Sequence, residues 1–194
     1  MKKFSGHNLV IGATGTGKGV LVASKAREWM NAGGKVFLLC NKQDEYDDFP
    51  DINRRCFKTM NQARLIEEVK KLRAPAKGFI DTLVIIDEAW DWNWKGKGGL
   101  QFIPNAARAH GVEMWVQSQF PTQMAPTVRA NCQNIFCFLL QEPAAVEWAA
   151  RSYGEQFRRV ADLKAGQYIA KRGLEPPFVG WSWYIDKNGK FRSV

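Results

Sequence analysis

The residue types best suited to chemistry lie close to the start of the chain, in the run Gly12-Ala13-Thr14-Gly15-Thr16-Gly17-Lys18. Glycines let successive backbone N–H groups turn toward phosphate oxygens, and a lysine after the last glycine reaches the β- and γ-phosphates of a nucleotide. An apolar run precedes this stretch and a helix-like run follows it, so a helix would point its positive end at the same anion. The predicted phosphate-binding loop is Gly12, Ala13, Thr14, Gly15, Thr16, Gly17, Lys18, Gly19 and Val20.

One position departs from the pattern of such loops. The residue after the lysine is usually Ser or Thr, whose hydroxyl helps to hold Mg²⁺, and here it is Gly19. Three interpretations stay open: a water replaces the hydroxyl, metal and nucleotide bind more weakly, or the site binds nucleotide without turnover. The predicted fold is the same in each case.

A second motif supplies two carboxylates. The apolar run 83–86 reads as a buried strand and ends at Asp87 and Glu88. Ligands of open α/β sheets bind at the carboxyl ends of the strands. There Asp87 is suited to hold Mg²⁺, directly or through water, and Glu88 to orient the water that attacks a γ-phosphate. Together with Lys18, these residues predict a nucleotide-hydrolysing site that uses ATP and Mg²⁺.

A third strand predicted at 112–116 leads into polar residues that would lie beside the γ-phosphate. We expect Gln119 to sense that phosphate, with Gln117 and Ser118 as its neighbours. A solvent-facing amide is the alternative interpretation for Gln119. Like Glu88 and Lys18, Gln119 is counted here as a candidate catalytic residue.

Composition narrows the functional classes. The chain has 28 Lys and Arg against 19 Asp and Glu, and its net charge of +9 favours a polyanionic partner such as nucleic acid. No apolar run approaches the roughly 18 residues that span a bilayer, so no membrane span is predicted. The four cysteines have no metal-ligand spacing and are expected to be free thiols, while two histidines are too few for a histidine-based metal site.

Apolar runs without alternation, separated by helical patterns, predict an α/β fold with a mainly parallel central sheet flanked by helices. We expect one domain over residues 1–194, with a nucleotide-binding core at 7–140 and a strand-rich extension at 155–194. The extension should add antiparallel strands to the edge of the sheet, with a hairpin turn at Asn188-Gly189. The predicted strands are 8–11, 35–40, 82–86, 112–116, 134–140, 167–170 and 181–185. The predicted helices are 18–32, 61–72, 100–109 and 143–152, and residues 44–51 are expected to form a loop.

Three further segments carry a family resemblance. Arg108-Ala109-His110-Gly111 precedes the third strand, Gln119-Phe120-Pro121 follows it, and Pro126-Thr127-Val128-Arg129 comes next. With the two nucleotide motifs, this arrangement resembles the FtsK/HerA superfamily of DNA-translocating ATPases over residues 7–140. The small size is similar to that of the genome-packaging ATPases of tailless, often membrane-containing icosahedral viruses. The resemblance implies a RecA-like P-loop NTPase fold.

The resemblance also implies partners. Family members form rings, so a hexamer or pentamer of this chain is expected, with nucleotide between subunits and an arginine donated by the neighbour. Arg108 and Arg129 fit that role by motif, and a structural salt bridge is the alternative for each. Double-stranded DNA would pass through the ring, capsid vertex proteins would be further partners, and the protein would act in the host cytoplasm or at a capsid vertex.

The segment after Glu88 offers a candidate grip for the DNA backbone. Lys95 and Lys97 alternate with glycines there, and Trp92 and Trp94 precede them. Lysines of this kind neutralise phosphates, and tryptophans stack on bases. The alternative is that the tryptophans are buried against the subunit and anchor the loop.

Two other functions remain open at this point. One is the assembly ATPase of filamentous phages, the zonula-occludens-toxin-like group, which normally continues into a transmembrane helix. The other is a nucleotide-binding structural protein without turnover, for which Gly19 is the motivation.

Overall fold

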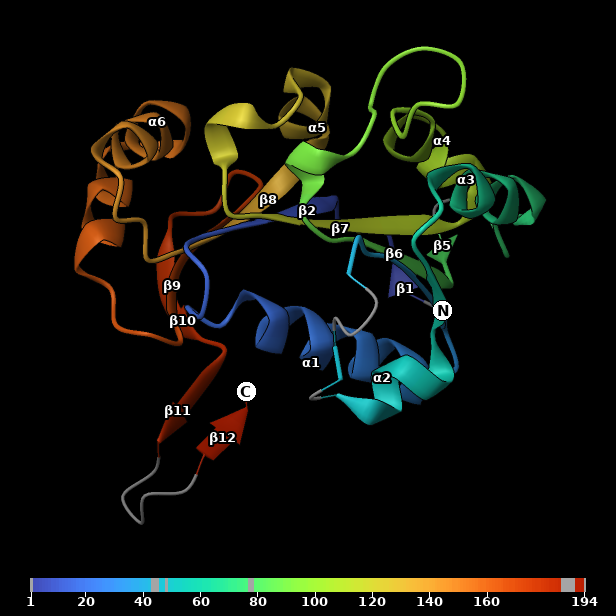
Figure 1. The fold of residues 1–194 in the computed structure, drawn as a ribbon, viewed down its shortest axis with the longest axis horizontal. Helices are drawn as coiled ribbons and strands as arrows, with labels where there is room; N and C mark the ends of the chain where they lie inside the picture. Colours follow the sequence, from blue (N-terminus) through green and yellow to red (C-terminus); the bar gives the residue numbers. More distant parts are fainter. Residues whose placement is uncertain (1, 43–45, 48, 77–78, 186–190, 194) are drawn as a thin grey trace.

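The computed structural model describes residues 2–42, 46–47, 49–76, 79–185 and 191–193 of the 194-residue chain. An eight-stranded sheet with the order β10-β9-β8-β2-β7-β6-β3-β4 forms the centre of the molecule (Figure 1). Its strands are β2 (His7–Ile11), β3 (Lys35–Leu39), β4 (Phe57–Thr59), β6 (Thr82–Ile86), β7 (Val112–Ser118), β8 (Cys132–Phe138), β9 (Gln167–Arg172) and β10 (Phe178–Trp181).

The six strands from β4 to β8 are parallel, and β9 and β10 continue the sheet in antiparallel fashion beyond β8. This confirms the predicted α/β class with antiparallel strands added by the C-terminal part. The register aligns the carboxyl ends of the inner strands, because Ile11 pairs with Ser118 and Ile86 pairs with Val116. The loops that follow β2, β6 and β7 therefore emerge side by side at one edge of the sheet.

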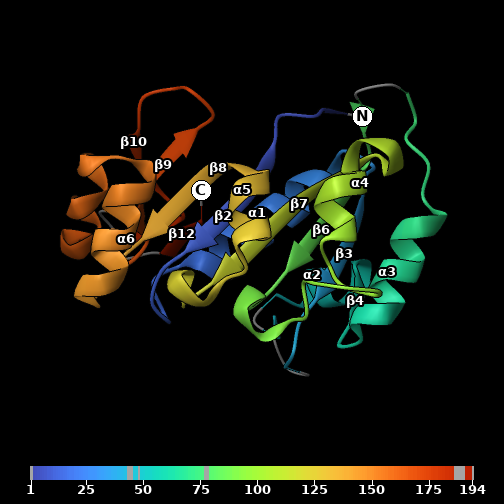
Figure 2. The same cartoon turned by 90° about the horizontal axis from the view of Figure 1, so that it is seen from above.

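Helices cover both faces of the sheet. In Figure 1, α1 (Lys18–Asn31) and α2 (Pro50–Arg55) lie on one face, and the remaining helices lie on the other. Figure 2 shows α6 at one end of that second face, α4 and α3 at the other, and α5 between them. The helices of the second face are α3 (Gln62–Lys71), α4 (Phe102–His110), α5 (Pro126–Asn131) and α6 (Pro143–Tyr153).

Two apolar clusters form the core, one on each side of the sheet. Successive residues of β2 divide between them, with Leu9 and Ile11 on one side and Val10 on the other. Because both faces of these strands are buried, they read as continuous apolar runs in the sequence. Short 3-10 helices complete the described fold at η1 (Ala89–Asp91), η2 (Pro121–Gln123) and η3 (Glu155–Asp162).

Several expected elements differ from those observed. The segment 44–51 was expected to be a loop, yet α2 begins at Pro50. The strand β4, the helix α5 and the 3-10 helix η3 were not predicted. The expected strand 181–185 is interrupted at Ser182, whose N–H donates to the carbonyl oxygen of Gly166 at 2.8 Å. Beyond that break, β11 (Trp183–Ile185) pairs with β12 (Phe191–Ser193) in a separate sheet. The predicted turn at Asn188-Gly189 lies outside the described residues.

A further small sheet and four free cysteines complete the described fold. The strands β1 (Lys2–Lys3) and β5 (Phe79–Ile80) form a two-stranded antiparallel sheet. Among the residues described, no helix has both the length and the apolar character needed to cross a bilayer. The four cysteines are free, as predicted, and burial raises the pKa of Cys56 to about 11 and that of Cys132 to about 12.

Candidate functional site

The phosphate loop connects the carboxyl end of β2 to the first turn of α1. Gly17 has a φ of 108° and caps the helix, which begins at Lys18. The Lys18 ammonium donates to the carbonyl oxygens of Gly12 at 2.8 Å and Ala13 at 3.0 Å. Thr16 Oγ1 donates to the same Ala13 oxygen at 2.7 Å. The Lys18 side chain thus folds back across the phosphate loop and bonds to its carbonyl oxygens, and the residue is only 9% exposed.

Asp87 follows β6 at the same edge of the sheet. It is 3% exposed, and its Oδ1 accepts hydrogen bonds from the backbone N–H of Glu88 at 3.0 Å and from Gln117 Nε2. Gln117 lies at the end of β7 and also donates to the Tyr46 hydroxyl at 2.8 Å. The neighbouring strand therefore orients the carboxylate that was predicted to hold magnesium.

Glu88 has a backbone conformation that its residue type rarely adopts. Its φ is 45° and its ψ is 62°, in the left-handed region, which costs about 1–3 kcal/mol for a residue with a side chain. Its Oε2 accepts hydrogen bonds from Trp90 Nε1 at 2.8 Å and from the backbone N–H of Gln119 at 3.3 Å. Strain of this kind clusters at functional sites, where it aims a side chain that regular backbone would direct elsewhere.

Gln119 links the phosphate loop to Glu88. Its side-chain Oε1 accepts a hydrogen bond from Thr14 Oγ1 at 2.7 Å, and its backbone N–H is bonded to Glu88. One connected set of hydrogen bonds thus joins residues that follow β2, β6 and β7.

The donor atoms around Asp87 fit a magnesium ion. Carboxylate and amide oxygens are the hard ligands that Mg²⁺ takes, usually together with waters and phosphate oxygens. Beside Asp87, the Gln117 Oε1 atom is buried and has no hydrogen-bond partner among the described residues. At Gly19 an added Cβ would meet no atom within 4 Å. Asp87 is therefore the residue that would hold the ion, and Gly19 leaves space beside the loop for water.

Sequence reasoning missed three contributors to this site. Gln117 was expected only as a neighbour of the sensor, whereas it donates to Asp87. The available signal was the position of Gln117 near the carboxyl end of β7, the strand that pairs with the Asp87-bearing strand β6. Tyr46 gave no local signal, since its hydroxyl is bonded to Gln117, which lies far from it in the sequence. Trp90 is only two residues from Glu88, but the sequence does not show that its indole turns back to bond that carboxylate.

The two arginine candidates lie on different helices of the second face. Arg108 is in α4, and its side chain is outside the part of the chain that the structure describes. Arg129 is in α5, with its Cζ atom 5.7 Å from the centre of the Trp148 ring. Within one chain this contact joins α5 to α6.

The candidate grip has an anchored base and an exposed tip. Trp92 Nε1 donates to the Asp87 carbonyl oxygen at 2.7 Å, and Trp94 Nε1 donates to that of Ala89 at 2.6 Å. Trp94 is 4% exposed and belongs to the core, which is incompatible with stacking of its ring on a base in this conformation. The structure thus supports the anchoring interpretation for the tryptophans, whereas Lys95 and Lys97 are exposed.

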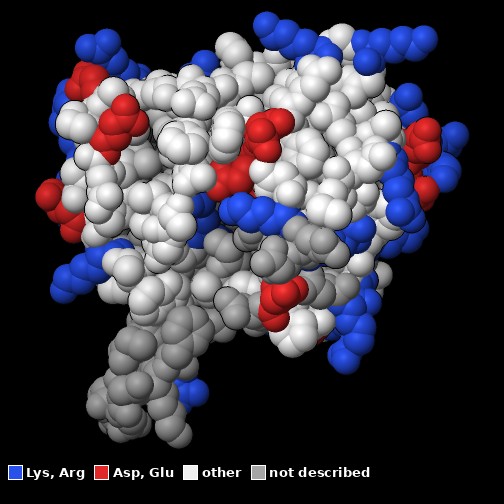
Figure 3. Space-filling model, in the orientation of Figure 1, with Lys and Arg blue, Asp and Glu red and all other residues white. Residues whose placement is uncertain are grey.

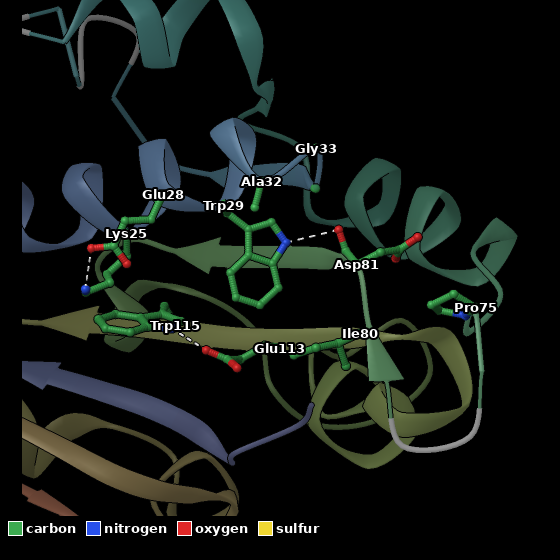
Figure 4. A pocket seen from close by; sticks show the side chains of 11 residues that line it. Lys25, Glu28, Trp29, Ala32, Gly33, Pro75, Ile80, Asp81, Glu113 and Trp115 are labelled. Atoms are coloured by element: carbon green, nitrogen blue, oxygen red, sulfur yellow. Dashed lines mark hydrogen bonds and ion pairs between the residues drawn. The ribbon is translucent and has the colours of Figure 1, made fainter. Parts of the chain in front are cut away.

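The surface charge is scattered, and a surface pocket lies apart from this site. On the face shown in Figure 3, basic side chains lie both around the periphery and near the centre, and they do not form one continuous stripe. A pocket of about 480 Å³ lies at the amino ends of the strands, opposite the phosphate loop. Its walls include the indoles of Trp29 and Trp115, and Trp115 Nε1 donates to Glu113 at 2.8 Å (Figure 4). This pocket is separate from the nucleotide motifs.

The sequence matches no protein-family model and no curated protein. Its structure is nevertheless similar to that of the genome packaging NTPase B204 from Sulfolobus turreted icosahedral virus 2 in complex with sulfate. The match covers 92% of this chain and 96% of that one, with a TM-score of 0.71 and 18% sequence identity. The protein therefore shares the α/β fold of this NTPase, with a mostly parallel central sheet and antiparallel strands at one edge.

Other solved structures share this fold. The pCW3 conjugation coupling protein TcpA, solved with ATPγS, matches with a TM-score of 0.63 and 15% identity over 95% of this chain and 62% of that one. The N-terminal domain of zonular occludens toxin from Neisseria meningitidis matches with a TM-score of 0.54 and 16% identity over 95% and 97%. B204 itself has been solved with AMP, AMPPCP and ATPγS.

Proposed function

We propose that this protein is an ATPase that drives double-stranded DNA into a preformed viral capsid. One observation carries the proposal: the phosphate loop, Asp87, Glu88 and Gln119 meet in a single hydrogen-bonded set at the carboxyl edge of the sheet. The likeness to a genome packaging NTPase over nearly the whole chain supports the choice of that function among those of P-loop ATPases.

The residues divide the work of hydrolysis. Backbone N–H groups of residues 14–20 and the Lys18 ammonium bind the phosphates, whereas the Ala13 N–H stays bonded to the Leu139 carbonyl oxygen. Lys18 exchanges its bonds to the Gly12 and Ala13 carbonyl oxygens for phosphate oxygens. Asp87 would hold a Mg²⁺ ion, which would supply positive charge to neutralise the phosphates. Glu88 accepts a hydrogen bond from the attacking water, either at Oε1 or at Oε2 in exchange for one of its present donors.

Gln119 is positioned to report the γ-phosphate. Its side chain is bonded to Thr14 of the loop and its backbone to Glu88. Arrival of a triphosphate competes for Thr14 and frees the Gln119 amide to bond to the phosphate. The same exchange alters the hydrogen bonding of Glu88, so that nucleotide binding and activation of water are coupled.

The site is completed in a ring of subunits. We assign the stimulating arginine to Arg108 or Arg129 of a neighbouring subunit; such a residue raises turnover by about 10³–10⁵-fold. DNA in the ring is gripped by Lys95 and Lys97 through its phosphates, since a translocase must move any sequence. Capsid vertex proteins are the partners of the assembled ring.

The rate of ATP hydrolysis, measured against protein concentration with and without duplex DNA, tests this proposal. Because the arginine acts between subunits, the rate per subunit should rise steeply with concentration and rise again with DNA of any sequence. A rate per subunit that is independent of both, under conditions where oligomers form, would refute the translocase assignment.

The grip is tested by salt dependence. The logarithm of the DNA-binding constant falls linearly with the logarithm of the salt concentration, and the slope becomes shallower by about 0.9 for each phosphate contact that is lost. The K95A/K97A double variant should therefore make this slope shallower by roughly two. The K70A/K71A double variant on α3 is the matched control, because it removes the same amount of charge. Equal changes in both variants would indicate general charge attraction without a grip at Lys95 and Lys97.

Binding without turnover is the second candidate function, because Gly19 removes the usual hydroxyl next to Lys18. A magnesium-dependent hydrolysis assay separates it from the first. The likeness to zonular occludens toxin supports a third candidate, virion extrusion at a membrane. Sedimentation of the protein with membranes, when expressed alone, would favour that candidate.

A further inference from the structure

The C-terminal part of the chain is bonded to the phosphate loop. Gly166, which precedes β9, donates its N–H to the Thr16 carbonyl oxygen at 2.9 Å. Ser182, between β10 and β11, donates its N–H to the Gly166 carbonyl oxygen at 2.8 Å and is fully buried. The loop is thus covered by two segments that lie far from it in sequence, and β11 passes the start of α1 (Figure 1).

Trp183 lies directly against this junction. A Cβ built on Gly17 would be 2.8 Å from Trp183 Nε1 and 3.1 Å from its Cδ1. A Cβ built on Gly166 would be 3.2 Å from Cδ2 and Cε2 of the same ring. Both glycines have φ values, 108° and 87°, that side chains rarely adopt. One edge of the indole therefore contacts the loop backbone, and the ring remains only partly buried.

The direction of the nucleotide follows from the strand order. The residues suited to the γ-phosphate, Asp87 and Gln119, follow β6 and β7, which lie on one side of β2. The strands β8, β9 and β10 lie on the other side. A triphosphate with its γ-phosphate near Asp87 must therefore direct its α-phosphate and nucleoside toward the side where Trp183 packs on Gly17.

We propose that Trp183 forms one wall of the nucleoside site and stacks on a purine base. This inference rests on the proposed function, because it assumes that a nucleoside triphosphate occupies the loop. An indole offers a large flat face whose stacking on a base is strong and does not read the base's hydrogen-bonding edge. ATP and GTP are accordingly bound with similar affinity, and the smaller pyrimidine nucleotides more weakly.

The experiment compares two probes, ATPγS and inorganic tripolyphosphate, by calorimetric titration in the presence of Mg²⁺. Tripolyphosphate presents the phosphates without a base. For W183A the dissociation constant of ATPγS should rise by roughly ten-fold or more, while that of tripolyphosphate stays within two-fold of the unsubstituted protein. W181A, which removes the same side chain from β10, should change neither value.

A W183F variant keeps an aromatic face if the alanine variant fails to fold. It should retain most of the ATPγS affinity, because the phenyl ring still offers a flat face for the base. Equal weakening of both probes by W183A would assign Trp183 to support of the loop and overturn the inference. Unchanged ATPγS affinity in W183A would also overturn it. If the unsubstituted protein bound tripolyphosphate and ATPγS equally well, the base would have no site, whereas binding of neither probe would refute the proposed function itself.

Discussion

Serine at position 19 would restore the one hydroxyl that the phosphate loop lacks. Gly19 is the second residue of α1, its φ lies outside the left-handed range, and a Cβ there meets no atom within 4 Å. G19S is therefore accommodated without displacement of a neighbour. We expect the new hydroxyl to reach the ion held by Asp87 and to increase the contribution of Mg²⁺ to nucleotide affinity.

Two magnitudes follow from this geometry. A bond to a charged group contributes about 1.5–3 kcal/mol, so the Mg²⁺-dependent part of the ATPγS affinity should increase by roughly 10- to 100-fold in G19S. Serine is also a better helix former than glycine by about 0.5 kcal/mol. In a chain of this length that gain corresponds to a melting temperature higher by about 1–2 °C.

The matched control is G19A, which adds the same Cβ without a hydroxyl. Alanine exceeds glycine in helix propensity by about 1 kcal/mol, so G19A should raise the melting temperature more than G19S. The order for nucleotide affinity in Mg²⁺ should be the reverse, with serine above alanine. Titration of ATPγS with Mg²⁺ and with EDTA measures the difference. Equal affinities for G19S and G19A in Mg²⁺ would refute the reasoning and show that another donor already fills this position.

Four further tests address other parts of the structure. E88Q should lower the rate of ATP hydrolysis by about 10²–10⁴-fold and leave the affinity for ATPγS unchanged. W90F removes the indole N–H that bonds Glu88 Oε2, and it should raise the DNA-independent rate of hydrolysis by about five-fold. A W90F rate at or below that of the unsubstituted protein would argue against restraint of Glu88 by Trp90. The Arg27 guanidinium lowers the pKa of the Asp51 carboxyl in the folded protein. The ion pair therefore stabilises the fold fully above the unfolded-state pKa of Asp51, and this contribution is lost as the pH falls through the folded-state pKa. D51N should reduce the melting temperature at pH 7 and leave it unchanged at a pH below the folded-state pKa. Burial raises the pKa of the Cys137 thiol, and mass spectrometry should find it unalkylated by iodoacetamide at pH 8 until denaturant is added.

The parts of the fold that were predictable are those with strong local signals. Strands β2 and β6 are buried on both faces and therefore read as unbroken apolar runs. The phosphate loop was predictable because close approach of backbone to phosphate requires glycines at fixed spacing. The shared carboxyl edge follows from parallel pairing, so it could be expected from these runs alone that the loops carrying Lys18, Asp87 and Glu88 emerge at one edge of the sheet.

The parts that were not predictable depend on tertiary contacts. Trp90 and Trp94 occur in one alternating run, yet they are 36% and 4% exposed, because only Trp94 reaches the core beneath η1. The strand break at Ser182 is set by its bond to Gly166, which no local pattern signals. The left-handed conformation of Glu88 likewise arises from the acceptors and donors around it, since glutamate has no preference for that region.

A crystal structure with ATPγS and Mg²⁺ tests the central claim most directly. The account predicts that Lys18 Nζ leaves the Gly12 and Ala13 carbonyl oxygens and bonds to the β- and γ-phosphates, with Asp87 and Glu88 facing the γ-phosphate. A triphosphate bound elsewhere in the molecule, or bound at the loop with Lys18 still bonded to those carbonyl oxygens, would contradict it.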